Sequence, residues 1–441
     1  MSMVVKNNMP ALNTLNTLNK NSNALTKSLA KVSSGMKVNS AQDDASGYAI
    51  SERMRVQIRS LDQANSNTQN GSAMMKTAEG AVSSTVDILK TLKEKVISAA
   101  NDDKTDSDRL QIQKELNQSV DQIDNNANIT YNGKTLVDGS KNIKTGATCT
   151  VMYTESLDTD TDTGSVMTAL KDRNGNSLQI RETDKITVSF VKQGRTFTTT
   201  TTISTKTFDE VMKLTAYNGT ESLVGSDFLT LSAKTSLLGT DGNGKQVTTA
   251  DGGCAVFVTA ASSGQDNQIA GFTMTVRDYQ GNVSTSVNNI LDSFTESIRS
   301  VNKSNDNTIT LHVGAKAGQS IKVGLTDMRA SALGLKGSDN EVVNVSTQEK
   351  ANAAINVLDN AIQKAVEQQT TIGSIESRLE YTSTNLTTAS ENVQASESTI
   401  RDADMAKEMT EYTKNNVLLQ AAQSMLSQAN QNSSAVLSLL Q

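Results

Sequence analysis

Few residues in this chain of 441 amino acids could carry chemistry. The sequence contains a single histidine, His312, and two cysteines, Cys149 and Cys254. A zinc protease motif needs two histidines, and a Ser-His-Asp site would have to use His312 alone. Because His312 falls in an expected strand with no partner histidine, a structural role is the better interpretation. We therefore expect no catalytic site, no metal site and no bound cofactor.

Two further segments resemble ligand loops only in part. Residues 239–246 read Gly-Thr-Asp-Gly-Asn-Gly-Lys-Gln, but Gln246 stands where a phosphate loop has a magnesium-binding Ser or Thr. Asp158, Asp160 and Asp162 alternate as in a calcium loop, yet Thr163 and Ala169 replace the obligatory glycine and the bidentate glutamate. These departures favour a turn for the first segment and a solvated acidic loop for the second.

The cysteine count, the net charge and the first twenty residues bear on the redox state, on nucleic-acid binding and on membrane insertion. Cys149 and Cys254 fit either a disulfide within an inserted domain or two free buried thiols, and both remain open. A net charge of -6 without a basic cluster disfavours nucleic acid. Residues 1–20 alternate Leu with Asn and Thr, which is typical neither of a signal peptide nor of a membrane anchor. No membrane insertion is expected.

Both ends of the chain carry a heptad-like apolar rhythm. In the first forty residues, positions separated by four and three form one amphipathic stripe: Leu18, Ser22, Leu25, Leu29, Val32 and Met36. The last forty residues repeat the rhythm at Met405, Met409, Tyr412, Asn416, Leu419, Ala422, Leu426, Ala429, Ser433, Val436 and Leu440. The two stripes predict helices that pair with each other as a coiled coil.

Longer helices adjoin these ends. Leu358, Ala365, Ile372, Leu379, Leu386, Val393 and Ile400 are spaced by seven residues and predict one long helix. Ser40 and Asp43 stand three residues apart, and we expect them to form a capping box at the start of an N-terminal helix. Apolar stripes over 75–96 and 112–127 predict further helix, followed by a tight turn at Asn132-Gly133.

The middle of the chain obeys a different period. Residues 185–191 and 195–203 alternate Val, Ile, Phe and Thr with period two, as strands do. Residues 309–313 and 320–323 read as a hairpin that returns the chain to the helical region. The predicted fold class is mainly α, with discontinuous N- and C-terminal coiled-coil domains, a β-hairpin and an inserted β-rich (α+β) variable domain. The expected domains are 1–40 with 402–441, 41–140 with 308–401, and the insert 141–307.

The composition of the terminal stripes predicts assembly. Ser22, Asn416 and Ser433 interrupt them, so the coiled coil is weak by itself and its ends are expected to be poorly ordered in a monomer. Neighbouring copies would supply the missing apolar contacts. We therefore expect a homopolymer whose subunit interface includes Leu18, Leu25, Leu29, Val32, Met405, Met409, Leu419, Leu426, Val436 and Leu440.

Two ordered motifs also carry a family resemblance. Residues 33–47 read Ser-Ser-Gly-Met-Lys-Val-Asn-Ser-Ala-Gln-Asp-Asp-Ala-Ser-Gly, and residues 396–409 read Ser-Glu-Ser-Thr-Ile-Arg-Asp-Ala-Asp-Met-Ala-Lys-Glu-Met. Together with the ending Val-Leu-Ser-Leu-Leu-Gln at 436–441, they resemble the termini of bacterial flagellin. The resemblance covers about residues 1–140 and 308–441, and the insert carries none.

This resemblance implies a non-enzymatic subunit of the extracellular flagellar filament. In the family the terminal helices form an inner tube, and the insert projects outward. It also implies export without a cleavable signal, through the flagellar export apparatus, with a C-terminal export chaperone that would bind around 418–440. Filament cap and hook-junction proteins are further expected partners.

The resemblance further implies a possible contact with Toll-like receptor 5. The family's receptor face often reads Leu-Gln-Arg-Val-Arg-Glu-Leu, and the corresponding run here is Leu-Lys-Thr-Leu-Lys-Glu-Lys at 89–95. Thr91 replaces an arginine fork, and Lys95 places a charge where leucine would be buried. We expect weakened receptor activation through a face formed by Leu89, Thr91, Leu92, Glu94, Lys95 and Glu115. The alternative interpretation is that these residues are ordinary variations on a packed helix face.

Two other functions remain open at this point. A hook-filament junction protein of the same superfamily shares helical ends, although the extended C-terminal match argues against it. An enzyme or adhesin displayed by the filament could hide its site in residues 141–307, but no carboxylate or hydroxyl constellation announces one.

Overall fold

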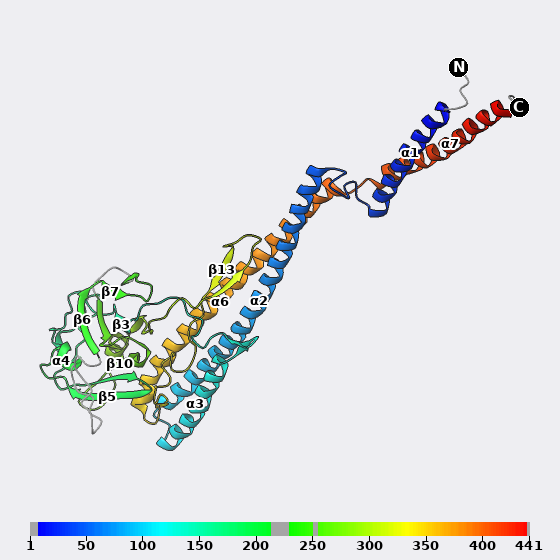
Figure 1. The fold of residues 1–441 in the computed structure, drawn as a ribbon. Coiled ribbons are helices and arrows are strands. Elements are labelled where there is room, and N and C mark those ends of the chain that lie inside the picture. Colours follow the sequence, from blue (N-terminus) through cyan, green and yellow to red (C-terminus); the bar gives the residue numbers. More distant parts are fainter. Residues whose placement is uncertain (1–7, 213–228, 250–254, 439–441) are drawn as a thin grey trace. The chain divides into compact units, whose positions relative to one another are not determined.

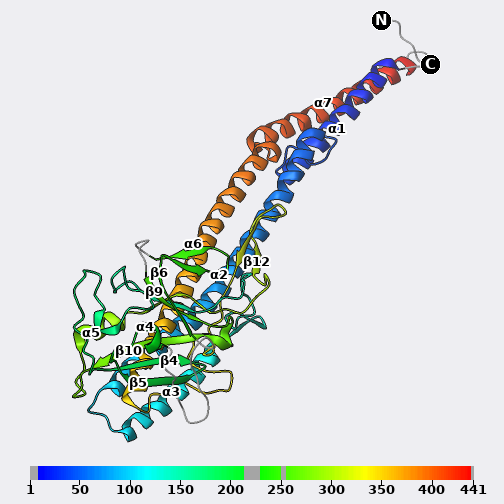
Figure 2. The same cartoon turned by 90° about the vertical axis from the view of Figure 1, so that its left-hand side faces the viewer.

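The chain divides into two compact units, shown in Figures 1 and 2. The computed structural model describes residues 8–212, 229–249 and 255–438. The first unit comprises Met1–Thr68, His312–Gln319 and Tyr381–Gln441, and the second comprises Gln69–Leu311 and Ser320–Glu380.

Helices dominate both ends of the described sequence. The α-helices are α1 (Met9–Ser34), α2 (Ala45–Ala100), α3 (Asp106–Ala127), α4 (Phe208–Met212), α5 (Thr285–Leu291), α6 (Gln348–Arg401) and α7 (Met405–Ser438). Two short 3-10 helices are η1 (Met167–Ala169) and η2 (Gln265–Asn267). The helices predicted over 75–96, 112–127 and 358–400 are therefore confirmed as parts of α2, α3 and α6.

The strands form small antiparallel sheets. They are β1 (Thr130–Tyr131), β2 (Lys134–Thr135), β3 (Val151–Thr154), β4 (Lys185–Lys192), β5 (Arg195–Thr202), β6 (Leu229–Thr235), β7 (Leu237–Thr240), β8 (Gln246–Thr248), β9 (Ala255–Ala260), β10 (Ile269–Arg277), β11 (Thr295–Ile298), β12 (Ile309–His312) and β13 (Ser320–Val323). The two larger sheets have the orders β10-β4-β5 and β11-β3-β9-β6, and the pairs β1-β2, β7-β8 and β12-β13 are hairpins. The strands predicted at 185–191 and 195–203 and the hairpin predicted at 309–323 are confirmed.

Local side-chain bonds define where the terminal helices begin. Asn8 caps α1, because its Oδ1 accepts a hydrogen bond from the Ala11 amide at 3.1 Å. Gly35 ends α1 at a φ of 71°, a conformation that glycine adopts without strain. Asp404 caps α7, since its Oδ1 accepts from the amides of Ala406 and Lys407 at 3.0 and 3.3 Å.

The capping box predicted at Ser40 and Asp43 is wrong. Asp43 accepts hydrogen bonds from the amides of Asn39 and Ser40, which closes a turn ahead of the helix. The helix α2 begins later, at Ala45, where Asp44 accepts a bond from the Ser46 amide. A capping box does occur at α3, between Thr105 and Asp108. Three-residue spacing alone cannot distinguish an isolated turn from a helix start.

Within the second unit, α2, α3 and α6 lie side by side (Figures 1 and 2). The predicted apolar stripes are buried, including Val82, Leu92 and Val96 of α2. Leu116 and Val120 of α3 are buried as well. Polar contacts at the surface join the same helices, such as the bond from Asn126 Nδ2 of α3 to Ser84 Oγ of α2.

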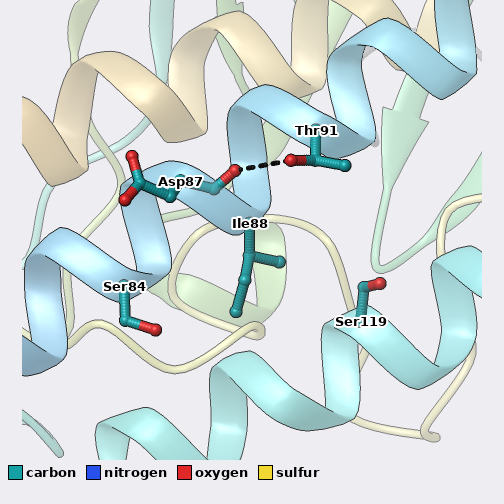
Figure 3. A pocket seen from close by; sticks show the side chains of 5 residues that line it. All are labelled: Ser84, Asp87, Ile88, Thr91 and Ser119. Atoms are coloured by element: carbon teal, nitrogen blue, oxygen red, sulfur yellow. Dashed lines mark hydrogen bonds between the residues drawn. The ribbon is translucent and has the colours of Figure 1, made fainter.

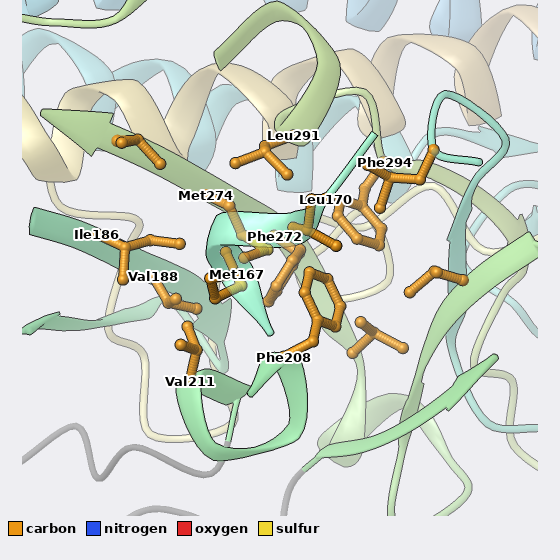
Figure 4. Close-up of a cluster of buried hydrophobic side chains, with 14 of the residues drawn as sticks. Met167, Leu170, Ile186, Val188, Phe208, Val211, Phe272, Met274, Leu291 and Phe294 are labelled. Atoms are coloured by element: carbon orange, nitrogen blue, oxygen red, sulfur yellow. The ribbon is translucent and has the colours of Figure 1, made fainter. Parts of the chain in front are cut away.

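The β-rich part has its own apolar core, shown in Figure 4. Ile186, Val188 and Phe190 point into it from β4, and Phe272 and Met274 from β10 join them. Phe272 meets Phe294 edge to face, with ring centroids 4.8 Å apart. The outward-facing neighbours are hydroxyl residues, which explains the period-two alternation of these strands.

A polar stripe on α6 holds the β-rich part against the helices. Asn356 Nδ2 donates to the Phe272 carbonyl at 3.1 Å, and Asn360 Nδ2 donates to the Ala270 carbonyl at 2.9 Å. Between these two carbonyls lies Gly271, where a Cβ atom would come within 2.8 Å of Val357. The absence of a side chain thus allows β10 to approach α6 closely.

Charged groups continue this attachment. Lys364 is buried and donates to the Ala332 carbonyl at 2.7 Å. Burial lowers the pKa of Lys364 to about 8. Arg299 pairs with Glu367 at 2.6 Å and with Glu296 at 3.2 Å. Residues 141–307 therefore belong to one compact unit with parts of α2 and α6, rather than forming a unit of their own. The three-domain division remains a prediction.

Candidate functional site

The helices α1 and α7 form an antiparallel pair within the first unit, visible in Figures 1 and 2. Asn21 Nδ2 donates to the Leu418 carbonyl at 3.2 Å, and Asn415 Nδ2 donates to Ser28 Oγ at 3.0 Å. Lys31 pairs with Glu408 at 3.6 Å. Polar groups thus take part in the contact between these helices.

Five of the predicted interface residues are partly covered in the single chain. They are Leu18, Leu25, Val32, Leu419 and Leu426. They recur with the same alternating spacing as the buried Ser28 and Ala422, so that one narrow seam runs along the pair.

The other predicted residues do not share this seam. Leu29, Met405 and Met409 are exposed, with Leu29 keeping 51% of its surface in contact with solvent. The side chain of Val436 and the whole of Leu440 lie outside the described residues.

Sequence reasoning missed a second set of apolar residues on the terminal helices. These residues are exposed and large: Met9, Leu12, Leu15, Val417, Leu418 and Met425. A signal was available, because Val417, Leu418 and Leu419 are consecutive and successive helical residues are rotated by about 100°. Three such residues cannot all face one partner. The helix α7 is therefore apolar on several sides, which is typical of a helix surrounded by other helices.

The chain segments that join α1 to α2 and α6 to α7 are tied together. Lys37 N donates to the Arg401 carbonyl at 2.8 Å, and Ala403 N donates to the Gly35 carbonyl at 2.9 Å. The Arg401 side chain is buried; it pairs with Glu52 at 2.7 Å and lies over the Tyr48 ring at 5.4 Å. These contacts fix both junctions within the first unit.

The face expected to meet an innate receptor is only partly accessible. Leu89 and Leu92 point into the helical core and are buried. Thr91 and Glu94 are exposed, and Lys95 forms an ion pair with Glu115 at 3.2 Å. Four residues of the expected receptor face thus lie at the surface, namely Thr91, Glu94, Lys95 and Glu115, whereas its two leucines are buried.

Beside this face, a shallow hollow separates α2 from α3 (Figure 3). Ser84, Asp87, Ile88 and Thr91 line it from α2, and Ser119 lines it from α3. Thr91 Oγ1 donates to the Asp87 carbonyl at 3.0 Å, within its own helix. The small side chains leave a groove whose floor is Ile88.

The other candidate sites have ordinary structural roles. His312 is exposed on β12, and its carbonyl accepts a hydrogen bond from Asn67. Residues 239–246 include the turn between β7 and β8, in which Asp241 accepts the amides of Asn243 and Lys245. Asp158 accepts the amide of Asp160 in a local turn.

Cys149 is half-buried against the apolar core of the β-rich part, and burial raises the pKa of its thiol. Cys254 lies outside the described residues. The disulfide between Cys149 and Cys254 and the two free thiols therefore both remain predictions.

Over residues 8–212, 229–249 and 255–438, no group of three or more His, Cys, Asp and Glu side chains is arranged to hold a metal ion. None of the helices in that described part combines the length and the apolar character that crossing a membrane requires.

Comparison with known proteins agrees with the architecture of the two ends. Residues 5–142 match the bacterial flagellin N-terminal helical region, and residues 355–440 match the bacterial flagellin C-terminal helical region. A flagellin of Clostridium tyrobutyricum is 33% identical over 430 residues, covering 97% of this chain and 99% of that protein. A flagellin of Bacillus subtilis (strain 168) is 29% identical over 458 residues, covering 99% of this chain and 100% of that protein.

Similarity to solved structures is weak. The flagellar hook associated protein-3 of Legionella pneumophila covers 78% of this chain and 97% of its own, at 16% identity and a TM-score of 0.33. A likeness of that size carries no argument about function. The matches at both ends and the identity along nearly the whole length show that this chain belongs to the bacterial flagellins.

Proposed function

We propose that this chain is the structural subunit that polymerises into the extracellular flagellar filament and thereby serves motility. One observation carries the proposal: large apolar side chains line the solvent-facing sides of α1 and α7, which the single chain leaves in water. Val417 and Met425 keep 60% and 63% of their surface exposed. Exposed apolar surface of this extent marks an interaction site, and other copies of the same helices complement it.

The polar residues that interrupt the seam support the same proposal. Ser28 and Asn415 occupy positions between the two helices where a self-sufficient coiled coil has aliphatic residues. Fully burying one Leu or Val contributes roughly 1.5 to 3 kcal/mol, so the seam of one chain gains little compared with contacts on several sides. The terminal pair is therefore suited to a bundle of many copies.

Seeded elongation tests this function. Purified monomer is mixed with short filament fragments, and filament length is followed by electron microscopy and light scattering. Val417→Asn is expected to abolish elongation while leaving the melting temperature of the second unit unchanged. The matched control Gln423→Asn, on an exposed polar position of the same helix, is expected to elongate like the wild type.

A filament of normal length from Val417→Asn would contradict the proposal. Growth that stops after a short ring in the wild type would favour the hook-junction alternative. The export chaperone around 418–440, the cap protein and the export apparatus stay predictions from the family.

We also propose that any activation of Toll-like receptor 5 by this chain is weak. Thr91 and Lys95 are the surface positions that depart from the family's face, and the Lys95 ammonium is paired with Glu115. The double variant Thr91→Arg and Lys95→Leu is expected to raise potency in receptor reporter cells by roughly thirtyfold, since two gained contacts of about 1 kcal/mol each add up to about 2 kcal/mol. Wild-type potency equal to that of a strongly stimulating flagellin would contradict the proposal.

We propose that the chain is not an enzyme. Its family is structural, and the described residues that resembled ligand loops are engaged in local turns. Display of an adhesin by residues 141–307 is a separate question.

A further inference from the structure

A small polar cleft lies where the start of α6 meets the outward face of the sheet β10-β4-β5. Its lining comes from three segments, namely Thr187 and Ser189 of β4, Thr273, Thr275, Arg277 and Val283 on and after β10, and Gln348, Glu349 and Asn352 of α6. The register places Thr187 beside Thr275 and Ser189 beside Thr273. Two rows of hydroxyl groups therefore face the first turn of α6.

Some of these hydroxyl groups are already engaged. Thr187 Oγ1 and Thr200 Oγ1 are 2.9 Å apart, and Ser189 Oγ donates to Thr198 Oγ1 at 3.1 Å. Both pairs join β4 to β5, on the side of β4 away from β10. They therefore build the sheet and leave the β10 side of the cleft untouched.

The remaining polar side chains have no such partners. Within the described part of the chain, no hydrogen bond or ion pair is made by the side chains of Thr273, Thr275, Arg277, Gln348, Glu349 and Asn352. Thr273 is nevertheless buried. Thr275, Arg277, Gln348 and Asn352 are half-buried and Glu349 is exposed, so these polar groups are open to hydrogen bonds from water or from a ligand in the cleft.

The chemistry of the lining defines the ligand class. Arg277 and Glu349 carry opposite charges, so their sum favours a neutral ligand over an anion or a cation. Two amides and two threonine hydroxyls supply both donors and acceptors. A carbohydrate hydroxyl also donates and accepts, and a ring with adjacent hydroxyls matches this mixture.

The size of the cleft limits how much of a ligand can enter. Its volume is about 80 Å³, and a water molecule in the liquid occupies about 30 Å³. Two or three hydroxyl-sized groups therefore fit inside. A whole sugar ring does not, and its remainder would lie over the rim beside Val283, which is 54% exposed.

We propose that this cleft between α6 and β10 binds the hydroxyl-bearing edge of one neutral sugar residue, with Gln348, Asn352 and Arg277 donating hydrogen bonds and Glu349 accepting them. The proposal goes beyond polymerisation and does not depend on it. All of the residues that line the cleft lie between the two segments matched to the flagellin termini.

Saturation-transfer difference NMR on the full-length monomer tests the proposal. The probes are the methyl α-glycosides of glucose, mannose, galactose and N-acetylglucosamine, with glycine as a zwitterion. Inorganic phosphate has no carbon-bound proton to observe, so its binding is measured by displacement of the glycoside signal. At least one glycoside is expected to show saturation transfer from the protein with a millimolar Kd. Phosphate and glycine are expected to show no specific binding.

Matched variants on α6 locate the site. Gln348→Ala and Asn352→Ala are each expected to weaken glycoside binding by about tenfold, because a lost polar partner leaves a ligand hydroxyl unpaired. Gln363→Ala, an exposed glutamine elsewhere on the same helix, is the control and is expected to leave binding unchanged. Glu349→Gln preserves shape and replaces an acceptor with an amide, so it is expected to weaken binding severalfold.

Three outcomes would overturn the proposal. They are the absence of saturation transfer to every glycoside, unchanged glycoside binding by both Gln348→Ala and Asn352→Ala, and tighter binding of glycine or phosphate than of any glycoside. Thermal melts of each variant by circular dichroism ensure that a loss of binding is not a loss of folding. The same variants are also tested for seeded elongation. This shows whether they still form filaments, so that a failure of the glycoside proposal can be told apart from a failure of the proposed filament function.

Discussion

The terminal helices and the second unit use polar residues in opposite ways. In the pair α1 and α7, Ser28 and Asn415 interrupt the apolar seam while Val417 and Met425 face solvent. In the second unit, apolar residues such as Phe272 are buried, and even the charged Lys364 lies inside with a hydrogen-bond partner. The terminal region leaves large apolar side chains in water as a single chain, whereas the second unit buries its own apolar core.

This difference locates the sources of stability. The second unit gains its free energy of folding within one chain, through apolar burial and through the bonds from Asn356 and Asn360 to β10. The terminal pair can gain comparable free energy only between chains. In a subunit built in this way, the second unit is stable in the monomer, whereas the terminal pair gains most of its stability from contacts with other copies.

The largest effect should come from the core of the β-rich part. Phe272→Ala removes a buried ring that contacts Phe294, and it is expected to lower the free energy of unfolding of the second unit by about 3–5 kcal/mol. Leu419→Ala in the half-exposed terminal seam should cost the monomer less than about 1.5 kcal/mol, since little apolar surface is lost. Urea denaturation of the two monomeric variants provides the measurement.

The order of the two effects is the decisive result. If Leu419→Ala destabilised the monomer as much as Phe272→Ala, the terminal pair would be self-sufficient and the comparison would fail. The same Leu419 variant should still impair elongation, because polymer contacts add to the buried area at that position.

A second effect follows from a carboxylate in the second unit. Burial raises the pKa of Asp292 to about 6 from its ordinary 3.8, although the Met274 amide and the Asn356 side chain partly offset this. The folded state therefore binds more protons than the unfolded state between about pH 4 and 6. Stability falls as the pH rises through this window, and the cost is fully present above pH 6.

Asp292→Asn should remove that cost. A shift of about two pKa units corresponds to roughly 3 kcal/mol, so the variant is expected to be more stable than the wild type at pH 7.5 by up to about that amount. Its advantage should shrink as the pH approaches 4. Thermal melts of both proteins across this range provide the test, and an unstable variant at pH 7.5 would show that the ionised carboxylate is itself a structural acceptor.

Sequence periodicity predicted the elements well but not their polar contacts. Period seven around Ile372 and Leu379 located α6, and period two located β4 and β5, because each pattern reports one apolar face. Asn356 and Asn360 carry no such signal. Their partners are backbone carbonyls on β10, about ninety residues away, and no local pattern encodes that pairing.

The candidate interface was predictable only in part for a related reason. A heptad assumes one partner per helix, and it correctly gathers Leu18, Leu25 and Leu419 along the seam. Residues on the other sides of α7, such as Val417 and Met425, fall outside any single heptad. A helix with several partners carries apolar residues on more than one side, and a search for one stripe overlooks those outside it.

The smallest effect compares equivalent helix caps in the two regions. Thr105 caps α3 by accepting the Asp108 amide, and Asp404 caps α7 by accepting the amides of Ala406 and Lys407. Replacing either residue with alanine should cost about 1 kcal/mol.

The α3 helix packs on buried residues such as Leu116, so Thr105→Ala should lower the melting temperature without reducing the helical circular dichroism at 25 °C. The α7 helix lacks comparable support in the monomer, so the same loss in Asp404→Ala should unwind part of it and visibly reduce the helical signal, which seeding into filaments should restore. Equal helical signals from the two variants as monomers would mean that α7 is as firmly held as α3 before assembly begins.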